Sequence, residues 1–306
     1  MKKTIVISGI LMALASCGQA EPVFDAEAYE QEVMEWRAGR LQRLKDPQGY
    51  LNQVGLYWLE KGSYSVGSDS GNEIRLPDTA APLVGVFEVG DGGVWMTAAN
   101  GVDVYSDDQP VQRILIADDT TDAPVQITHR SLAWTVVKRD DRFAVRVRDF
   151  EHPFVATFGP LPYFPVDPSL RVPATLHRYD EPRIANVETV IEGLGYHPES
   201  PGTVSFAVDG QTFELEAYTS GDKLFFVFGD KTNRDDTYGA GRFLYAEAPD
   251  DDDRTVLDFN LSYSPPCAFN DFSTCPVASP RNRLPIRIEA GEKYDEALHY
   301  SADAGF

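Results

Sequence analysis

Short β-type segments separated by turn residues fill the chain from Tyr50 onward, and they constrain the fold more than any other feature. Runs rich in Val, Ile, Phe and Tyr alternate with clusters of Gly, Pro, Asn and Asp. Hairpin signals stand at three of the junctions, namely Asp91-Gly92-Gly93, Asp140-Asp141 and Asp209-Gly210. Because no helical period separates the runs, neighbouring strands are expected to pair antiparallel. The sequence predicts an all-β fold with two antiparallel β-sandwich or barrel-like units.

One amphipathic helix is predicted ahead of these strands. The residues that recur at helical spacing are Tyr29, Val33, Trp36, Arg40 and Leu44. They can share one stripe of a helix whose start is acidic and whose end is basic, as the helix dipole favours. Asp46 and Pro47 then stop the helix. We expect this helix to cover the domain that follows it.

A Pro-rich segment interrupts the rhythm of the strands. It contains five Pro between Tyr163 and Pro198 and a polar run, which is typical of a connection between two β units. The predicted divisions are 1–16 as a signal peptide, 17–49 as a tether with the N-terminal helix, 50–160 as the first β unit, 161–188 as a crossover, and 189–306 as the second β unit.

The first residues have the layout of a secretory signal. Lys2 and Lys3 precede an apolar run that is too short to span a membrane, and small residues follow it. The end of the run, residues 14–17, resembles the bacterial lipobox, which implies that Cys17 is acylated and holds the protein to a lipid bilayer. Gly18 after it implies the outer membrane, with the protein facing the periplasm. The alternative is an ordinary signal, cleaved at Ala20, with a chance Cys.

The net charge excludes one class of partner. The chain has 48 Asp and Glu against 27 Lys and Arg, which gives a formal net charge of −21. Nucleic acid is held mainly through phosphate contacts to Lys and Arg, and a strongly acidic protein repels it. We therefore expect no nucleic-acid partner.

The cysteines remaining after acylation of Cys17 are Cys267 and Cys275. In an oxidising compartment two thiols so close in sequence usually form a disulfide. Two alternatives stay open: free or redox-active thiols, and a metal site. The sequence has no C-x-x-C, and no His lies in the flanking segment, so little supports a metal site. No cofactor-binding motif is present. We predict the disulfide, no metal and no cofactor.

Polar and aromatic residues gather in the last third of the chain. The predicted ligand-binding residues are Tyr238, Arg242, Asp258, Asn260, Tyr263 and Asn270. Arg242 is expected to be buried or to line a cleft, paired with Asp258 or Asp230. Asp258 and Asn260 alternate with apolar residues and are expected to share one face of a strand. That face is either exposed to solvent or lines a pocket for an anionic or hydroxylated small ligand.

Several blocks of sequence together resemble a known family. They are residues 55–77, 138–150, 163–172, 237–246, 257–276 and 282–293. In the most specific of them, Tyr263 is followed by Pro266-Cys267 and then by Cys275-Pro276. The chain resembles the bacterial domain of unknown function 1684 family over roughly residues 50–293. That family has no established activity, so the resemblance implies a fold and a boundary but no catalytic residues.

Three functional hypotheses follow from these features. The first is an envelope lipoprotein whose second β unit binds a small polar ligand or an envelope component. The second is a hydrolase-like enzyme that uses Asp258 or Asp230 with Arg242, with Cys267 as a nucleophile. The third is a structural envelope protein without a ligand. A Cys nucleophile needs a free thiolate, so the oxidation state of Cys267 separates the first two.

Overall fold

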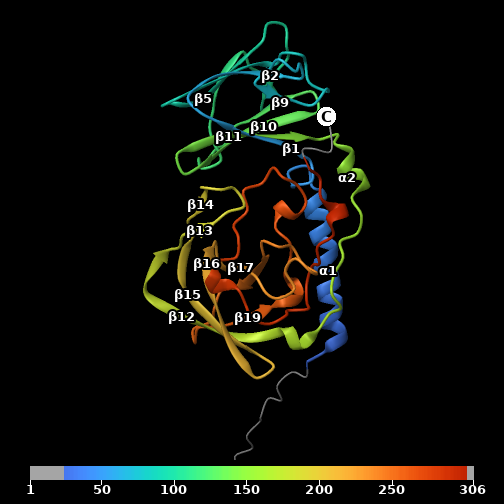
Figure 1. Ribbon diagram of the computed structural model, residues 1–306, viewed down its shortest axis with the longest axis vertical. Helices are drawn as coiled ribbons and strands as arrows, with labels where there is room; N and C mark the ends of the chain where they lie inside the picture. The colour runs from blue at the N-terminus through green and yellow to red at the C-terminus, as the bar shows by residue number, and fades with distance from the viewer. Residues whose placement is uncertain (1–23, 302–306) are drawn as a thin grey trace, which may run out of the picture.

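Two β units and one long helix make up the protein (Figure 1). The computed structural model describes residues 24–301. The helix α1 (Ala26–Lys45) precedes the strands, so the predicted all-β fold with an N-terminal helix is confirmed. Among the residues described, no helix is both long and apolar enough to cross a membrane. The predicted signal peptide and Cys17 lie outside the described residues.

Two packed sheets form the first unit. The six-stranded sheet runs in the order β1 (Gln53–Leu59), β11 (Arg142–Asp149), β10 (Leu132–Arg139), β9 (Gln126–His129), β6 (Tyr105–Ser106) and β7 (Gln109–Pro110). The five-stranded sheet runs in the order β3 (Ile74–Arg75), β2 (Gly62–Gly67), β4 (Gly85–Gly90), β5 (Gly93–Ala98) and β8 (Arg113–Ile116). All neighbours in both sheets pair antiparallel except β2 and β3, which pair parallel.

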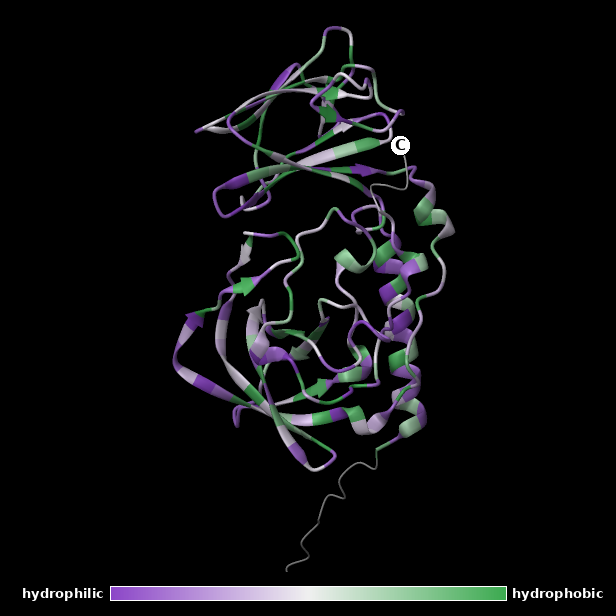
Figure 2. Cartoon of the chain, in the orientation of Figure 1, coloured by the Kyte–Doolittle hydropathy of each residue, from purple (hydrophilic) through white to green (hydrophobic). Residues whose placement is uncertain are grey.

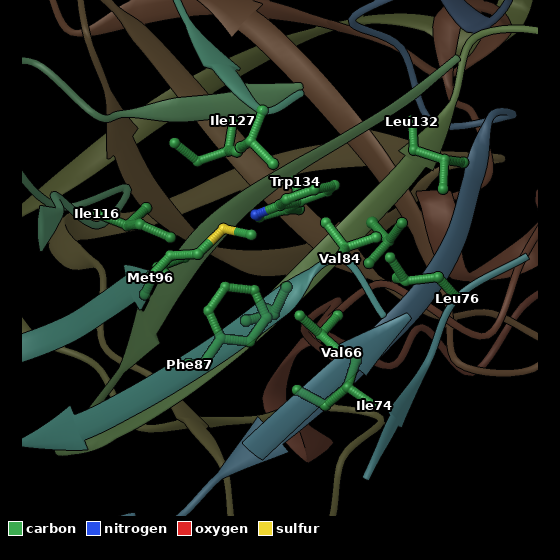
Figure 3. Close-up of a cluster of buried hydrophobic side chains, with 14 of the residues drawn as sticks. Val66, Ile74, Leu76, Val84, Phe87, Met96, Ile116, Ile127, Leu132 and Trp134 are labelled. Atoms are coloured by element: carbon green, nitrogen blue, oxygen red, sulfur yellow. The ribbon is translucent and has the colours of Figure 1, made fainter. Parts of the chain in front are cut away.

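The core of the first unit lies between its two sheets (Figure 3). Trp134 of β10 meets Phe87 of β4 edge to face, with ring centroids 6.5 Å apart. Both side chains are buried, and Met96 and Ile127 pack in the same cluster. Alternate residues of each strand supply this layer, as the period of two in a β-strand requires.

The predicted hairpins form where the turn residues stand. Arg139 pairs with Arg142 across the turn at Asp140, whose φ is 54°. Val208 pairs with Gln211 across Asp209 and Gly210, whose φ values are 50° and 74°. At Asp209 and Gly210, positive φ at both central residues is the type I′ geometry that suits the twist of paired strands. Asp and Gly tolerate it better than most residues.

The second unit is a nearly closed barrel. Its sheet runs in the order β18 (Arg242–Glu247), β17 (Lys223–Phe228), β16 (Gln211–Ser220), β15 (Glu199–Val208), β12 (Arg171–Ile184) and β19 (Arg254–Asp258). The edge strand β18 approaches the chain that follows β19, because Phe243 and Tyr263 exchange two backbone hydrogen bonds of 2.8 and 3.0 Å. Inside the barrel, Phe259 contacts Phe206 and Phe228, with centroids 5.4 Å away in each case.

Short elements complete the second unit. They are the pair β13 (Val187–Glu188) and β14 (Gly195–Tyr196), the helix α2 (Pro153–Thr157), and the 3₁₀ turns η1 (Pro168–Leu170), η2 (Phe259–Leu261), η3 (Pro266–Ala268), η4 (Pro280–Asn282) and η5 (Glu296–Leu298). Four of the five 3₁₀ turns lie after β19, so the last part of the chain is irregular and packs on the barrel.

The segment 161–188, expected as a crossover, instead contributes the longest strand. β12 spans 14 residues and pairs with both β15 and β19. Its second half is mostly exposed and carries charged residues, so it lacks the apolar alternation that marks a half-buried strand. Pro173 and Pro182 also lie within it, and Pro usually indicates a connection or an edge strand.

Helix α1 packs against the second unit, not against the first unit that follows it in sequence. The helix runs along the barrel in Figure 1, and hydrophobic and hydrophilic residues alternate along it in Figure 2. Its buried residues are Tyr29, Val33, Arg40 and Leu44, four of the five in the predicted stripe. Leu44 packs with Ala268 and Phe269 of the second unit. The second unit is therefore discontinuous, with the first unit inserted between α1 and the barrel strands.

Candidate functional site

Arg242 is fully buried and pairs with a carboxylate, as the sequence predicts, but it lines no open site. It starts β18, and its Nη2 lies 2.7 Å from Oδ2 of Asp230, with neither side chain exposed. The same nitrogen donates to the carbonyl of Ile288 at 2.9 Å, and Nη1 donates to the carbonyl of Ala290. Burial lowers the pKa of Arg242, and Asp230 opposes that effect. The pair is thus a structural bridge between β18 and the C-terminal segment.

Asp258 and Asn260 lie together with a residue from the helix. β19 ends at Asp258, whose carboxylate accepts from the backbone N–H of Asn260 at 3.1 Å and so caps η2. The two residues therefore do not share a strand face, because this capped turn ends the strand between them. The Tyr29 hydroxyl of α1 lies 2.8 and 3.0 Å from the two oxygens of Asp258 and donates to that carboxylate. Asn260 Nδ2 donates to the Tyr29 oxygen at 2.9 Å.

A groove opens beside Asp258, between α1 and the nearly closed edge of the barrel. We call it the helix–barrel groove; it has a volume of about 300 Å³. The residues that matter to its chemistry are Tyr29, Glu32 and Trp36 of α1 and Arg171, Tyr245, Glu247 and Asp258 of the barrel. A smaller hollow of about 190 Å³ shares Trp36, Tyr245 and Glu247 with it and adds Lys223 and Tyr263. The two form one aromatic-lined depression over the barrel edge.

The charge at the base of the groove is a buried carboxylate. Burial raises the pKa of Asp258, and the hydrogen bonds from Tyr29 and Asn260 and the nearby Arg171 oppose this rise. Arg171 Nε lies 3.8 Å from Oδ2 of Asp258. Burial also raises the pKa of Tyr29, so its hydroxyl remains a proton donor at neutral pH. Oδ2 accepts only from Tyr29 within residues 24–301 and keeps capacity to accept from a ligand.

Tyr263 reaches the groove region, whereas Tyr238 and Asn270 lie elsewhere. Tyr263 carries the guanidinium of Arg40 over its ring, 4.5 Å from the centroid. Tyr238 packs on Tyr294, with centroids 5.4 Å apart. Asn270 is buried and donates through Nδ2 to the carbonyl of Tyr50 at 2.9 Å, which ties the two β units together. Of the six predicted ligand-binding residues, the structure brings Asp258, Asn260 and Tyr263 to one side of the barrel.

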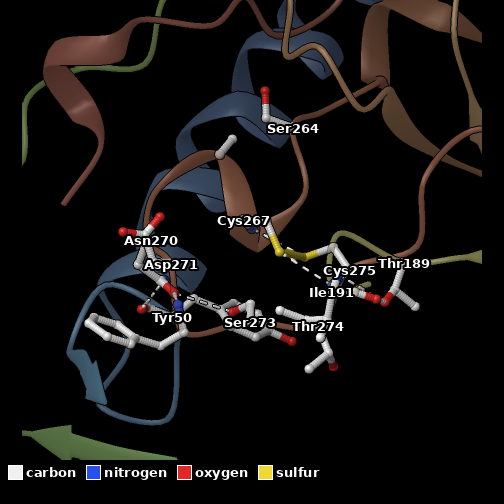
Figure 4. The surroundings of a disulfide bond; sticks show 12 residues. Tyr50, Thr189, Ile191, Ser264, Cys267, Asn270, Asp271, Ser273, Thr274 and Cys275 are labelled. Carbon is white, nitrogen blue, oxygen red and sulfur yellow. Dashed lines mark hydrogen bonds between the residues drawn. A yellow bond between two sulfur atoms is a disulfide. The ribbon is translucent and has the colours of Figure 1, made fainter. Parts of the chain in front are cut away.

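Cys267 and Cys275 form a disulfide, with Cα atoms 6.1 Å apart (Figure 4). Each sulfur also accepts from the partner's backbone N–H, at 3.2 and 3.3 Å. The nucleophilic form of Cys is the thiolate, which a sulfur bonded in a disulfide cannot form. Cys267 therefore cannot serve as a nucleophile in this state. In the described part of the chain, no three His, Cys, Asp or Glu side chains are grouped to hold a metal ion.

The groove depends on residues that the sequence did not single out as a site. Tyr29, Trp36, Arg171 and Tyr245 come from three separate segments. Trp36 offered the best signal, because a Trp that is not fully covered in a surface helix often marks a contact or binding surface. The other three have no local pattern that separates them from ordinary strand or helix residues.

We expect Arg242→Ala to lower the free energy of unfolding by about 3–5 kcal/mol, because it leaves Asp230 buried without its counter-charge. Arg242→Lys keeps the charge but loses the planar guanidinium that reaches Asp230 and two carbonyls. Its free energy of unfolding should therefore lie between those of the parent and of Arg242→Ala. Urea unfolding followed by circular dichroism measures both changes, with the exposed Arg281→Ala as the control. An Arg242→Ala protein as stable as its parent would contradict the structural role.

The comparisons with known proteins find a family and a solved structure that are both of unknown function. A family model described as a protein of unknown function, DUF1684, matches residues 156–293. This match covers the C-terminal part of the resemblance that the sequence shows over residues 50–293. An NMR structure of an uncharacterised Haloarcula marismortui protein is 33% identical, with a TM-score of 0.39, over 46% of this chain and 79% of that chain. No curated protein matches. Through its residues 156–293, the chain belongs to the DUF1684 family of proteins of unknown function.

Proposed function

We propose that the protein binds a small, neutral, hydroxylated ligand with the chemistry of a sugar in the helix–barrel groove. The observation that carries this proposal is the partly buried carboxylate of Asp258 at the base of an aromatic-lined depression. Ligand sites typically combine apolar and aromatic walls with a few placed polar groups. The site is therefore a binding site in the second β unit.

The polar groups of the groove suit hydroxyl groups. Oδ2 of Asp258 can accept from a ligand hydroxyl, and the half-exposed guanidinium of Arg171 can donate to one. The rings of Trp36 and Tyr245 offer apolar faces against which the C–H face of a sugar ring can pack. Each type of contact alone is common, and their combination in one depression supports a ligand that is polar at its edge and apolar on its face.

The charge balance of the groove disfavours an anionic ligand. Glu32, Glu247 and Asp258 contribute three carboxylates against the two cations Arg171 and Lys223. Lys223 is already paired with Glu247, at 2.6 Å. The strongly acidic chain adds to this negative potential. A neutral ligand avoids the repulsion that a phosphate or carboxylate meets there.

The hydrolase alternative receives less support from the same geometry. Asp230 and Arg242 are enclosed in the barrel with no exposed side-chain surface, so a substrate cannot reach them. Cys267 is bonded to Cys275. Of the residues that the hydrolase hypothesis uses, Asp258 alone lines the groove. Binding therefore accounts for more of the site than hydrolysis does.

We further propose that acylated Cys17 anchors the protein to the outer membrane on its periplasmic side. The support is the lipobox-like sequence of residues 14–17. The chain between Cys17 and Asp25, the N-cap of α1, can span at most about 30 Å. Since Tyr29 lies in the first turns of α1, an anchored protein carries its groove close to the bilayer.

The ligand proposal predicts that Trp36→Ala abolishes binding of a sugar that the parent binds. Isothermal titration calorimetry of the full-length protein first finds which sugar the parent binds. The panel consists of neutral monosaccharides and short oligosaccharides, with N-acetylglucosamine among them. Trp95→Ala is the matched control, since Trp95 is a partly exposed Trp of the first unit, far from the groove. Failure of every sugar to bind the parent, or equal binding by Trp36→Ala, would overturn the proposal.

Asp258→Asn separates lost binding from lost folding in the same titration. A raised carboxyl pKa means that the folded state holds its proton more tightly, so ionisation lowers stability as pH rises through the folded pKa. Asp258→Asn removes that ionisation and should melt higher than the parent at pH 7. The gain should shrink as pH falls through the raised folded pKa and should vanish below the usual Asp pKa of about 4. We expect this more stable protein to bind sugar at least ~10-fold more weakly.

The anchor proposal predicts that Cys17→Ala moves the protein from the membrane pellet to the soluble fraction. One acyl chain binds a bilayer only marginally and several hold firmly, so losing all of them should be decisive. Fractionation after a high-salt wash, with the parent run in parallel, measures the change. A Cys17→Ala protein that stays in the washed membranes would refute acylation at Cys17 as the anchor.

A further inference from the structure

A second cavity, independent of the helix–barrel groove, lies where the two β units meet. Its volume is about 170 Å³. Arg139 and Arg146 of the first unit line one side, and Ser273, Thr274 and Cys275 of the second unit line the other. The disulfide at Cys275 holds the second wall in place (Figure 4).

Arg146 lacks an acceptor. It lies on β11, and among residues 24–301 its guanidinium makes no hydrogen bond or ion pair, although its Nε is buried. Burial and, after it, the charge of Arg139 lower the pKa of Arg146 to about 10, so the group stays protonated at neutral pH. A buried donor without an acceptor is costly, and a charged one more so. In a chain with a large excess of acids, an unpaired Arg stands out.

The neighbouring groups leave positive charge uncompensated. Arg139 donates through Nη1 to both oxygens of Asp119, at 3.0 and 2.8 Å, so that carboxylate is already engaged. Arg148, on the same strand face as Arg146, donates to the carbonyl of Gly49 and to Oδ1 of Asn52, which are neutral acceptors. Three guanidiniums therefore share one directly contacting carboxylate.

A second unpartnered donor lies behind one of the residues that line this cavity. Gln53 of β1 is fully buried, and its Nε2 has no partner in the part of the chain that the structure describes. Its Oε1 accepts from the hydroxyl of Ser273 at 2.9 Å, which places the amide beside a lining residue. Buried amide donors are almost always satisfied, so two unsatisfied donors in one region indicate a missing acceptor.

We propose that this cavity binds a small oxyanion, a phosphate or a carboxylate, through the guanidinium of Arg146. The planar fork of Arg matches two oxygens of either group, and the contact is among the strongest hydrogen bonds in proteins. Thr274 supplies a hydroxyl from the second unit. The bound anion touches both units and so stabilises their docking.

Thermal melting of the full-length protein in sodium phosphate, sodium acetate or sodium chloride at matched ionic strength tests this proposal. The melting temperature should rise saturably with phosphate or acetate beyond the rise in chloride. A response to phosphate alone identifies a phosphate site, and a response to acetate alone identifies a carboxylate site. Arg146→Gln should weaken the apparent affinity about 10- to 100-fold.

Two further variants make the outcome decisive. Arg146→Lys keeps the charge and should fold, but it loses the fork and should also bind more weakly. Arg142→Gln removes an exposed Arg from the same strand and should respond as the parent does. Equal melting shifts in all three salts, no shift in any of them, or parent-like affinity in both Arg146 variants would overturn the proposal.

Discussion

A buried ion pair between Arg40 of α1 and Glu292 near the C-terminal end determines how the rest of the structure is arranged. Glu292 has no exposed side-chain surface, and burial raises the pKa of its carboxyl group against the opposing effect of Arg40. Arg40 Nε lies 3.3 Å from it, and the backbone N–H of Ser264 donates to it at 3.1 Å. A carboxylate in such a place is tolerated only with its counter-charge present. The helix is therefore part of the second unit.

This attachment explains both the order of the chain and the place of the groove. With α1 held on the second unit, the chain leaves the helix, builds the first unit and returns through α2 to β12 (Figure 1). Arg40 also lies over the ring of Tyr263, so one side chain orders both the helix and the barrel edge. Tyr29 and Trp36 are then carried to Asp258 and Tyr245. The groove exists because the helix closes one side of an open barrel edge.

The local features of the fold could be predicted from the sequence. The hairpin at Asp209 and the helical stripe from Tyr29 to Leu44 depend on neighbours in the sequence, and the structure confirms both. The burial of Arg242 followed from a Gly-rich turn before a strand, and of its two predicted partners the structure shows Asp230. The pairing of Cys267 with Cys275 followed from their short separation.

The long-range features could not be predicted, for physical reasons. Nothing in the helix indicates that Tyr29 meets Asp258, because that contact joins segments more than 200 residues apart. β12 carries charges and Pro because its second half is exposed, so its pattern does not differ from that of a loop. Asp258 and Asn260 alternate as on a strand, but capping by Asp258 ends the strand. The groove combines the contact of Tyr29 with Asp258, the strand β12 and the capped end of β19. Local sequence patterns therefore could not predict it.

Hydrogen exchange of the full-length protein and of Arg40→Ala tests the central claim, that the Arg40–Glu292 pair makes α1 part of the second unit. In the parent, the amides of α1 should be protected as strongly as those of β12 and β19. In Arg40→Ala, α1 should lose that protection while β4, β5 and β10 of the first unit keep theirs. Rapid exchange of α1 in the parent, or unchanged protection of α1 in Arg40→Ala, would contradict it.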